Sequence, residues 1–390
     1  GGILAGLKGD FVDLEGYFAT VLSKEPSINN MMLVGHNTVR SMVLGDARRA
    51  PTPAELTQMQ DHVRVALEQG CCGFSSGLIY RPGRYSDTEE VIEIAKVAGE
   101  FDALYTTHMR NEGDKLLEAV DEALLIGRES GSHLHISHHK AAGKANWGKV
   151  GQSLLKVEKA LLSGQAVTLD VYPYTAGSGR MIEYFNLDNP DEELARTIRI
   201  ASCPANKLYE GRMLVDIAKE DGKTMPEMVR SVLLAPEGDK TLCIQFVISE
   251  EDVETNIKQK DMMIGSDGIP DLKGRPHPRL FGTFPRVLGH YVREKKLIGL
   301  AEAIRRMTSL PARIFGMKER GRVAEGYHAD LVLFDSGSIS DQATYDQPML
   351  PPVGIKMVVV NGEIALSEGQ ATGVASGRML RYRNDSFSPS

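Results

Sequence analysis

Short apolar runs alternate with longer amphipathic segments along the first two thirds of the chain, and this alternation limits the possible folds most strongly. The runs interpreted as buried strands are residues 31–35, 73–78, 103–107, 133–137, 167–172, 242–247 and 262–266. Helices are predicted between them, for example at residues 52–69, where Thr52 and Glu55 form a capping-box pattern. Strand–helix units that repeat about every 30 residues favour an α/β fold with a parallel sheet.

Seven candidate strands approach the eight that close a TIM-type (β/α) barrel, although some of the seven are expected to lie outside it. We therefore predict a barrel-type catalytic domain over residues 1–318, with its first part missing before Gly1. The opening on Gly1-Gly2 without an initiator methionine fits this interpretation, and an expression scar would explain it equally well.

The last part of the chain, residues 319–390, has a different pattern. Leu331–Phe334 and residues 357–360 are short β-like runs, and the second is followed by Asn361-Gly362. An Asn-Gly pair between apolar runs is typical of a β-hairpin. We predict that this segment is the C-terminal part of a small β domain that is incomplete here.

Composition argues against two classes of partner. The 390 residues include 52 acidic and 45 basic side chains, for a net charge of -7, so no nucleic-acid interface is predicted. No apolar run reaches about 18 residues, so no membrane span is predicted. The cysteines lack the C-x-x-C spacing of metal sites, and the adjacent Cys71 and Cys72 are poor disulfide partners. A reduced, cytoplasmic protein is expected.

Polar residues follow several predicted strands, at the ends where (β/α) barrels carry their active sites. His108 and His138 are 30 residues apart, which is one strand–helix step, so we expect both imidazoles to face one cavity. Asp267 follows the strand at residues 262–266 and is expected to reach the same cavity. Imidazoles are common ligands of catalytic zinc, and a nearby carboxylate can act as a general acid and base. This pattern fits a metal-dependent hydrolytic site, and it fits about equally well two histidines that only form hydrogen bonds at the strand ends.

Other residues near these strand ends have structural alternatives. His139 is expected on the face opposite to His138, whereas His36 either lines the cavity or holds a loop. His135 is interpreted as structural, and Asp170 as the acceptor of a structural hydrogen bond. Arg279 follows Asp267 in a loop rich in glycine and proline, where it either binds a substrate carboxylate or is an ordinary solvated arginine.

Nine blocks of sequence follow one another between about His36 and Arg381. They are GHNTVR, GFSSGLIYRPGRYSDTEE, THMRNE, SHHKAAG, DVYPYTAGS, MIGSDG, HPRLFGTFPRVLG, MTSLPARIFG and RGRVAEGYHADLVLFD. Together they resemble the N-acyl-D-amino-acid deacylases (D-aminoacylases) of the amidohydrolase superfamily. The resemblance implies a TIM barrel flanked by a small β-sandwich, and zinc-dependent hydrolysis of the amide bond of a small-molecule substrate, an N-acyl-D-amino acid.

The same motifs imply roles for individual residues. Zinc ligands fall on His108 and His138, and the catalytic aspartate on Asp267. Contacts to the substrate carboxylate fall on Lys140, Tyr172 and Arg279. The family's early His-x-His and its Gly-Asn-Cys-Gly segment, which supplies a Cys ligand, have no counterpart in this sequence. The chain is therefore expected to be truncated at its N-terminus, to lack the thiolate ligand and to be inactive on its own.

Two alternatives remain open at this point. A cyclic-amide hydrolase of the dihydropyrimidinase-like kind would need a carboxylated lysine, for which Lys140 is the only near candidate. A catalytically inactive binding protein on the same scaffold would fit the missing ligands, but not the retention of His108, His138 and Asp267.

Overall fold

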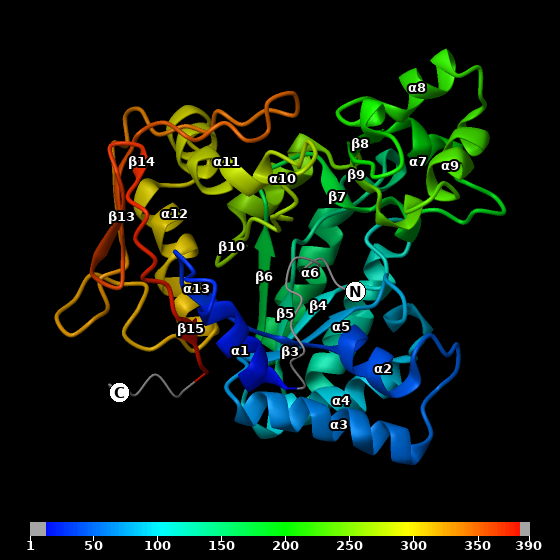
Figure 1. The fold of residues 1–390 in the computed structure, drawn as a ribbon. Helices are drawn as coiled ribbons and strands as arrows, with labels where there is room; N and C mark the ends of the chain where they lie inside the picture. The colour runs from blue at the N-terminus through cyan, green and yellow to red at the C-terminus, as the bar shows by residue number, and fades with distance from the viewer. Residues whose placement is uncertain (1–12, 383–390) are drawn as a thin grey trace.

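A parallel sheet of six strands forms the centre of the computed structural model, which describes residues 13–382 (Figure 1). The strand order is β10-β6-β5-β4-β3-β2. The strands are β2 (Val34–Gly35), β3 (Gly73–Gly77), β4 (Leu104–His108), β5 (His133–Ile136), β6 (Val167–Val171) and β10 (Met263–Ile264). The predicted α/β class and its parallel βα units are confirmed. The predicted break before Gly1 lies outside the described residues.

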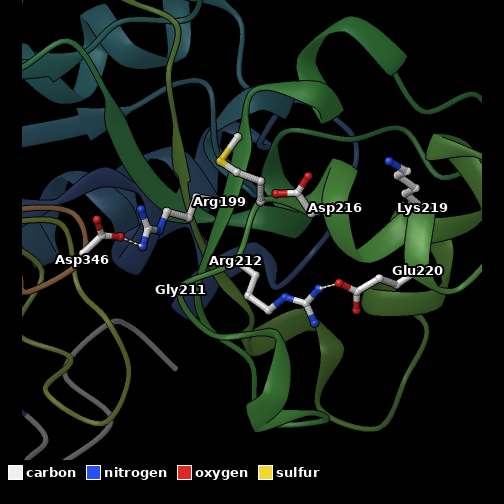
Figure 2. A pocket seen from close by; sticks show the side chains of 8 residues that line it. Arg199, Gly211, Arg212, Asp216, Lys219, Glu220 and Asp346 are labelled. Carbon is white, nitrogen blue, oxygen red and sulfur yellow. Dashed lines mark hydrogen bonds and ion pairs between the residues drawn. The ribbon is translucent and has the colours of Figure 1, made fainter.

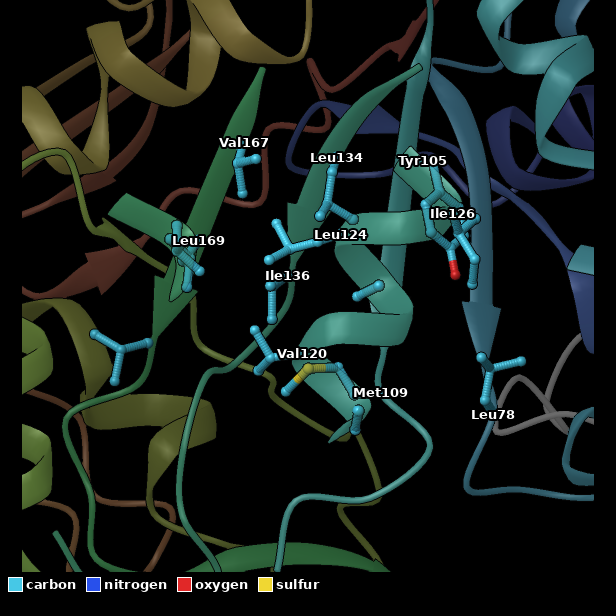
Figure 3. Packing of buried hydrophobic residues seen from close by; sticks show 14 of the residues in the cluster. Leu78, Tyr105, Met109, Val120, Leu124, Ile126, Leu134, Ile136, Val167 and Leu169 are labelled. Carbon is cyan, nitrogen blue, oxygen red and sulfur yellow. The ribbon is translucent and has the colours of Figure 1, made fainter. Parts of the chain in front are cut away.

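Helices connect these strands and bury their apolar faces against the sheet. They are α2 (His36–Leu44), α3 (Pro53–Glu68), α4 (Thr88–Glu100), α5 (Leu116–Ser130) and α6 (Lys149–Leu162). The predicted capping box opens α3, because Thr52 accepts from the Glu55 amide and Glu55 accepts from the Thr52 amide. In the core, Val120 and Leu124 of α5 belong to one apolar cluster with Ile136 of β5 (Figure 3).

The apolar run at residues 31–35, predicted as one strand, is divided between two. Asn30–Met31 (β1) pairs in parallel with Met379–Leu380 (β15), whereas β2 pairs with β3 of the central sheet. A single apolar run therefore serves two different partners, and an apolar pattern alone does not identify the partner of a strand.

Residues 242–247, one of the seven candidate strands, lie outside the parallel sheet, as expected for some of the seven. Leu242–Gln245 (β9) is the middle strand of an antiparallel sheet, between β7 (Gly177–Arg180) and β8 (Ile198–Ser202). Cys243 and Ile244 are buried in two different apolar clusters, so both faces of β9 are covered. A short run that is buried on both faces has the same pattern in a parallel strand and in a covered antiparallel strand.

This sheet is part of a subdomain inserted between β6 and α10 (Glu250–Lys258). Its helices are α7 (Glu192–Arg196), α8 (Leu214–Glu220) and α9 (Met225–Leu233), and they share an apolar core that includes Ile200, Leu214 and Met228. Figure 1 shows the inserted subdomain at the upper right, beside the ends of the barrel strands.

The remaining helices lead to the predicted β domain. They are α11 (Arg279–Arg286), which continues into a π-helix at Val287–Glu294, then α12 (Leu300–Met307) and α13 (Ser309–Ile314); α1 (Leu14–Leu22) lies near the other end of the chain. No helix within residues 13–382 has the length and apolar character needed to cross a membrane.

The C-terminal sheet is antiparallel, in the order β11-β12-β13-β14. Its strands are β11 (Leu331–Phe334), β12 (Ile355–Val360), β13 (Glu363–Ser367) and β14 (Gln370–Ala371). Asn361 and Gly362 connect β12 to β13 with φ values of 50° and 89°, the left-handed values that a tight hairpin turn needs. The predicted hairpin is confirmed.

Candidate metal and active site

His108 and His138 come together at the carboxyl ends of neighbouring parallel strands. His108 is the last residue of β4, and His138 follows β5 by two residues. Their ring centroids are 4.4 Å apart. The spacing of one strand–helix step placed these two rings correctly beside each other.

Glu112 joins the two imidazoles, and sequence reasoning missed it. Its Oε2 lies 3.4 Å from His108 Nε2, and its Oε1 lies 3.1 Å from His138 Nδ1. One ligand atom from each of the three residues lies within 4.8 Å of the others. Glu112 stands in the loop after β4, where no periodicity indicates which way a side chain points. Its place in the THMRNE block, four residues after His108, was the available signal.

The electrostatics of this cluster suit a divalent cation. Burial lowers the pKa of His108 to about 3, so its ring is neutral at physiological pH. Burial by itself would raise the pKa of Glu112, but the neighbouring His108, Lys140 and His138 hold that pKa well below its usual range. Neutral imidazoles and an ionised carboxylate are the forms in which these groups bind metals. His108 Nε2 is buried without a hydrogen-bond partner, so it is free to bind one.

Lys140 contacts this same cluster. Its Nζ donates to Glu112 Oε1 at 2.6 Å and to His138 Nδ1 at 2.8 Å. The ammonium also lies 5.6 Å from the ring centroid of Tyr172. In this arrangement Lys140 therefore neutralises Glu112, beside the aromatic ring that the family motifs group with it.

Asp267 and Arg279 form an ion pair beside Tyr172. Arg279 Nη2 lies 2.9 Å from Asp267 Oδ2, and the guanidinium carbon is 4.6 Å from the Tyr172 ring centroid. Arg279 is only 1% exposed, which rules out the solvated alternative, whereas Asp267 is 39% exposed. Arg279 Nε and Nη1 are buried without hydrogen-bond partners. Both N–H groups are therefore available to donate charge-assisted hydrogen bonds to a bound anion such as a carboxylate.

Two tyrosines that sequence reasoning did not single out complete the surroundings of His108. Tyr80 Oη lies 3.3 Å from His108 Nδ1. Tyr80 also shares a hydrogen bond with Tyr184 of the inserted subdomain, and burial raises the pKa of both phenols. The inserted subdomain thus reaches the site through Tyr184.

The other histidines hold the framework. His139 bonds Asn256 and Ser153 on the far side from the cluster, as expected. His36 contacts buried Glu90 at 2.9 Å, so it holds the structure together instead of lining the site. Burial raises the pKa of the Cys71 and Cys72 thiols to about 12, so both side chains pack as small uncharged residues.

A separate cavity of about 740 Å³ lies on the inserted subdomain, away from these residues (Figure 2). Its charged lining residues largely pair with one another, Arg199 with Asp346 and Arg212 with Glu220. None of the histidines described above contributes to it.

Comparisons with known proteins agree with this geometry. Residues 227–366 match the family model described as "Amidohydrolase family". The chain is 40% identical over 352 residues to the N-acyl-D-glutamate deacylase of Alcaligenes xylosoxydans xylosoxydans, covering 90% of this chain and 70% of that protein. It is 39% identical to the D-aminoacylase of the same organism, over 93% of this chain and 72% of the relative.

A solved structure shows the same relationship. The N-acyl-D-glutamate deacylase of Bordetella bronchiseptica, complexed with zinc and a phosphonate inhibitor, matches with a TM-score of 0.88 and 40% identity. The match covers 95% of this chain and 75% of that one, and it confirms the predicted barrel class. The chain therefore belongs to the N-acyl-D-amino-acid deacylase (D-aminoacylase) family of the amidohydrolases.

Proposed function

We propose that this protein is a zinc-dependent amidohydrolase that cleaves N-acyl-D-amino acids into a carboxylate and a free D-amino acid. The observation that carries the proposal is the cluster of His108, Glu112 and His138 beside the Asp267–Arg279 pair, in a chain 40% identical to an N-acyl-D-glutamate deacylase. This arrangement provides a metal-binding group, a carboxylate for proton transfer and a buried cation within one site.

His108, His138 and Glu112 would hold the zinc ion. Three protein ligands are the usual number at a catalytic zinc site, and a fourth position then remains for water or substrate. Zinc bound there supplies a Lewis acid that lowers the pKa of a water molecule and polarises the acyl carbonyl. In this proposal Glu112 provides the third ligand, beside His108 and His138.

The other side chains of the site would bind the substrate and move a proton. Arg279, through its free Nε and Nη1 donors, would bind the α-carboxylate, assisted by Tyr172 and Lys140. Asp267 would accept a proton from the attacking water and return it to the departing amine nitrogen. A carboxylate fixed by Arg279 on one side of the scissile bond orients the chiral carbon, which would select the D enantiomer.

The alternatives find less support. A cyclic-amide hydrolase needs a carboxylated lysine, but Lys140 Nζ lies 2.6 Å from Glu112 Oε1, where a second negative charge would be repelled. An inactive scaffold would not need a buried, unpartnered His108 Nε2 or the free donors of Arg279. The four cysteines are all free and buried, which supports the proposal of a cytoplasmic enzyme with a small-molecule substrate.

The test measures zinc content and the release of free amino acid from paired N-acetyl-D- and N-acetyl-L-amino acids. We expect zinc-dependent hydrolysis of the D enantiomers only. Equal activity on both enantiomers, or two bridged metals with cleavage of cyclic amides, would contradict the proposal. The prediction made from the sequence, that the chain is inactive on its own, is the opposite outcome of this assay, in which neither enantiomer is hydrolysed.

A further inference from the structure

Asp170 holds the backbone of His138 at the point where β5 leaves the sheet. The ladder between β5 and β6 ends at the pair of Ile136 and Leu169. Beyond it, the His138 amide donates to Asp170 Oδ1 at 2.7 Å, and the His139 amide donates to the Asp170 carbonyl at 2.8 Å. Two successive amides of the loop are thus bound by one residue of the neighbouring strand.

The backbone of His138 needs such support because its φ is 41°. Residues with a Cβ rarely adopt this left-handed conformation, and it persists only where the surrounding structure fixes it. Here it directs two adjacent imidazoles to different places. The His138 ring lies 4.4 Å from that of His108, whereas His139 bonds Asn256.

The Asp170 carboxylate is itself fixed from two sides. His135 Nε2 donates to its Oδ2 at 2.7 Å, and His135 Nδ1 lies 2.9 Å from Thr168 Oγ1. On the other side lies Gly265, two residues before Asp267, where a Cβ would stand 3.0 Å from Asp170 Oδ1. The oxygen that binds the His138 amide therefore also packs against the strand end that leads to Asp267.

We propose that Asp170 is a positioning residue for the metal site, which fixes the left-handed backbone of His138 and thereby aims its imidazole at His108 and Glu112. This proposal rests on the proposed function for the identity of the metal. It assigns to Asp170 a role that depends on the place of its acceptor oxygen and not on its charge.

Three substitutions of Asp170 in the full chain distinguish the effect of the position of its acceptor oxygen from the effect of its negative charge. Asp170→Asn keeps an oxygen that can accept from the His138 amide. The NH₂ group of the asparagine can donate to His135 Nε2, provided that the His135 ring carries its proton on Nδ1, the nitrogen that faces Thr168. Asp170→Glu keeps the charge but moves the acceptor by one methylene. Asp170→Ala removes the acceptor altogether. Asp252→Ala is the matched control, because this buried carboxylate also binds a backbone amide, that of Gly148, but outside the metal cluster.

The measurement is a titration of each variant with zinc in competition with a chromophoric chelator, with a thermal melt of each variant in the absence of metal. We expect Asp170→Ala and Asp170→Glu to lower zinc affinity by roughly 10–100-fold, the usual loss when a partner that orients a metal ligand is removed. Asp170→Asn and Asp252→Ala should bind zinc like the unsubstituted chain, although Asp252→Ala should melt at a lower temperature.

The possible failures are distinguishable. The positioning role would be overturned if Asp170→Glu bound zinc with unchanged affinity. It would also be overturned if Asp170→Asn lost zinc affinity while Asp170→Glu kept it. Either result would leave the proposed function intact. Absence of zinc binding by the unsubstituted chain would overturn both. If Asp170→Ala does not fold, the Asn and Glu variants still decide the question.

Discussion

Arg279 Nη2 and Asp267 Oδ2 lie 2.9 Å apart, so the residue proposed to bind the substrate carboxylate also holds the residue proposed to move the proton. The sequence motifs assign these two side chains separate roles. Their contact means that a substitution at either one affects both, and experiments must be designed to separate the two effects.

Changing Asp267 to Asn should leave zinc bound and lower kcat by about 100–10,000-fold, the usual contribution of general acid–base catalysis. The amide can still accept a hydrogen bond from Arg279, so substrate binding should change little. The measurement combines steady-state kinetics on an N-acetyl-D-amino acid with metal analysis. Asp341→Asn serves as a control, because Asp341 pairs with Arg286 outside the metal cluster. Near-normal turnover by the Asp267 variant would refute its role.

Changing Arg279 or Lys140 to Ala should reduce kcat/KM far more on a free acid than on the corresponding neutral amide. A charge-assisted hydrogen bond contributes about 1.5–3 kcal/mol, or roughly tenfold or more, and only the acid makes it. For Arg279→Ala, any fall in kcat/KM on the neutral amide substrate measures the effect of losing the contact between Arg279 and Asp267. Arg286→Ala is the control, since this arginine stacks on Tyr174. Equal losses on both substrates would show that neither residue recognises the carboxylate.

Changing Glu112 to Gln should weaken zinc binding by at least about tenfold, because the neutral amide replaces a carboxylate whose pKa is held well below its usual range. Equilibrium dialysis against zinc gives the affinity. Glu122→Gln, which removes only an ion pair with Arg110, should bind zinc normally. If the Glu112→Gln variant keeps full affinity, Glu112 is not a ligand.

The pH dependence of stability should depend on His277. Burial, together with the charge of Arg279, holds the pKa of His277 well below 6.5, and the neutral ring donates to the Ala176 carbonyl and accepts from the Arg279 amide. As the pH falls below about 6.5, the unfolded chain takes up a proton at this residue that the folded chain does not. Stability is therefore lost toward acid, by about 1.4 kcal/mol per pH unit for this one proton.

The test compares unfolding by urea at pH 7.5 and pH 5 for the unsubstituted chain and for His277→Gln. The variant should lose less stability over this interval, by at most about 2 kcal/mol, whatever its stability at pH 7.5. Parallel losses in the two chains would mean that His277 takes up its proton equally in both states.

Glu90 should matter for stability and not for the metal. Its Oε1 lies 2.9 Å from His36 Nε2 and 3.1 Å from Arg40 Nε, and all three side chains are buried. Glu90→Ala leaves a buried arginine unpaired, which costs about 3–5 kcal/mol. Glu93→Ala, which breaks an exposed pair with Lys96, should cost less than about 1 kcal/mol. A lowered melting temperature with unchanged zinc affinity is expected for Glu90→Ala, and similar melting of the two variants would contradict the assignment.

The sequence predicted those parts of the molecule that follow from regular spacing. Parallel strands one step apart bring their carboxyl ends together, which is why His108 and His138 could be paired without a structure. Glu112 and Tyr184 could not be found in this way, because they lie in irregular segments where side-chain direction depends on tertiary contacts. The position of β9 was missed for a related reason, since burial on both faces does not reveal the direction of a strand.

The inserted subdomain has an apolar core of its own and contacts the site through Tyr184. Leu214 and Met228 pack in this core, which contains no residue of the strands that carry the metal-binding side chains. A substitution within this core can therefore reshape the inserted subdomain, and through Tyr184 one wall of the site, while the strands that carry His108 and His138 stay in place.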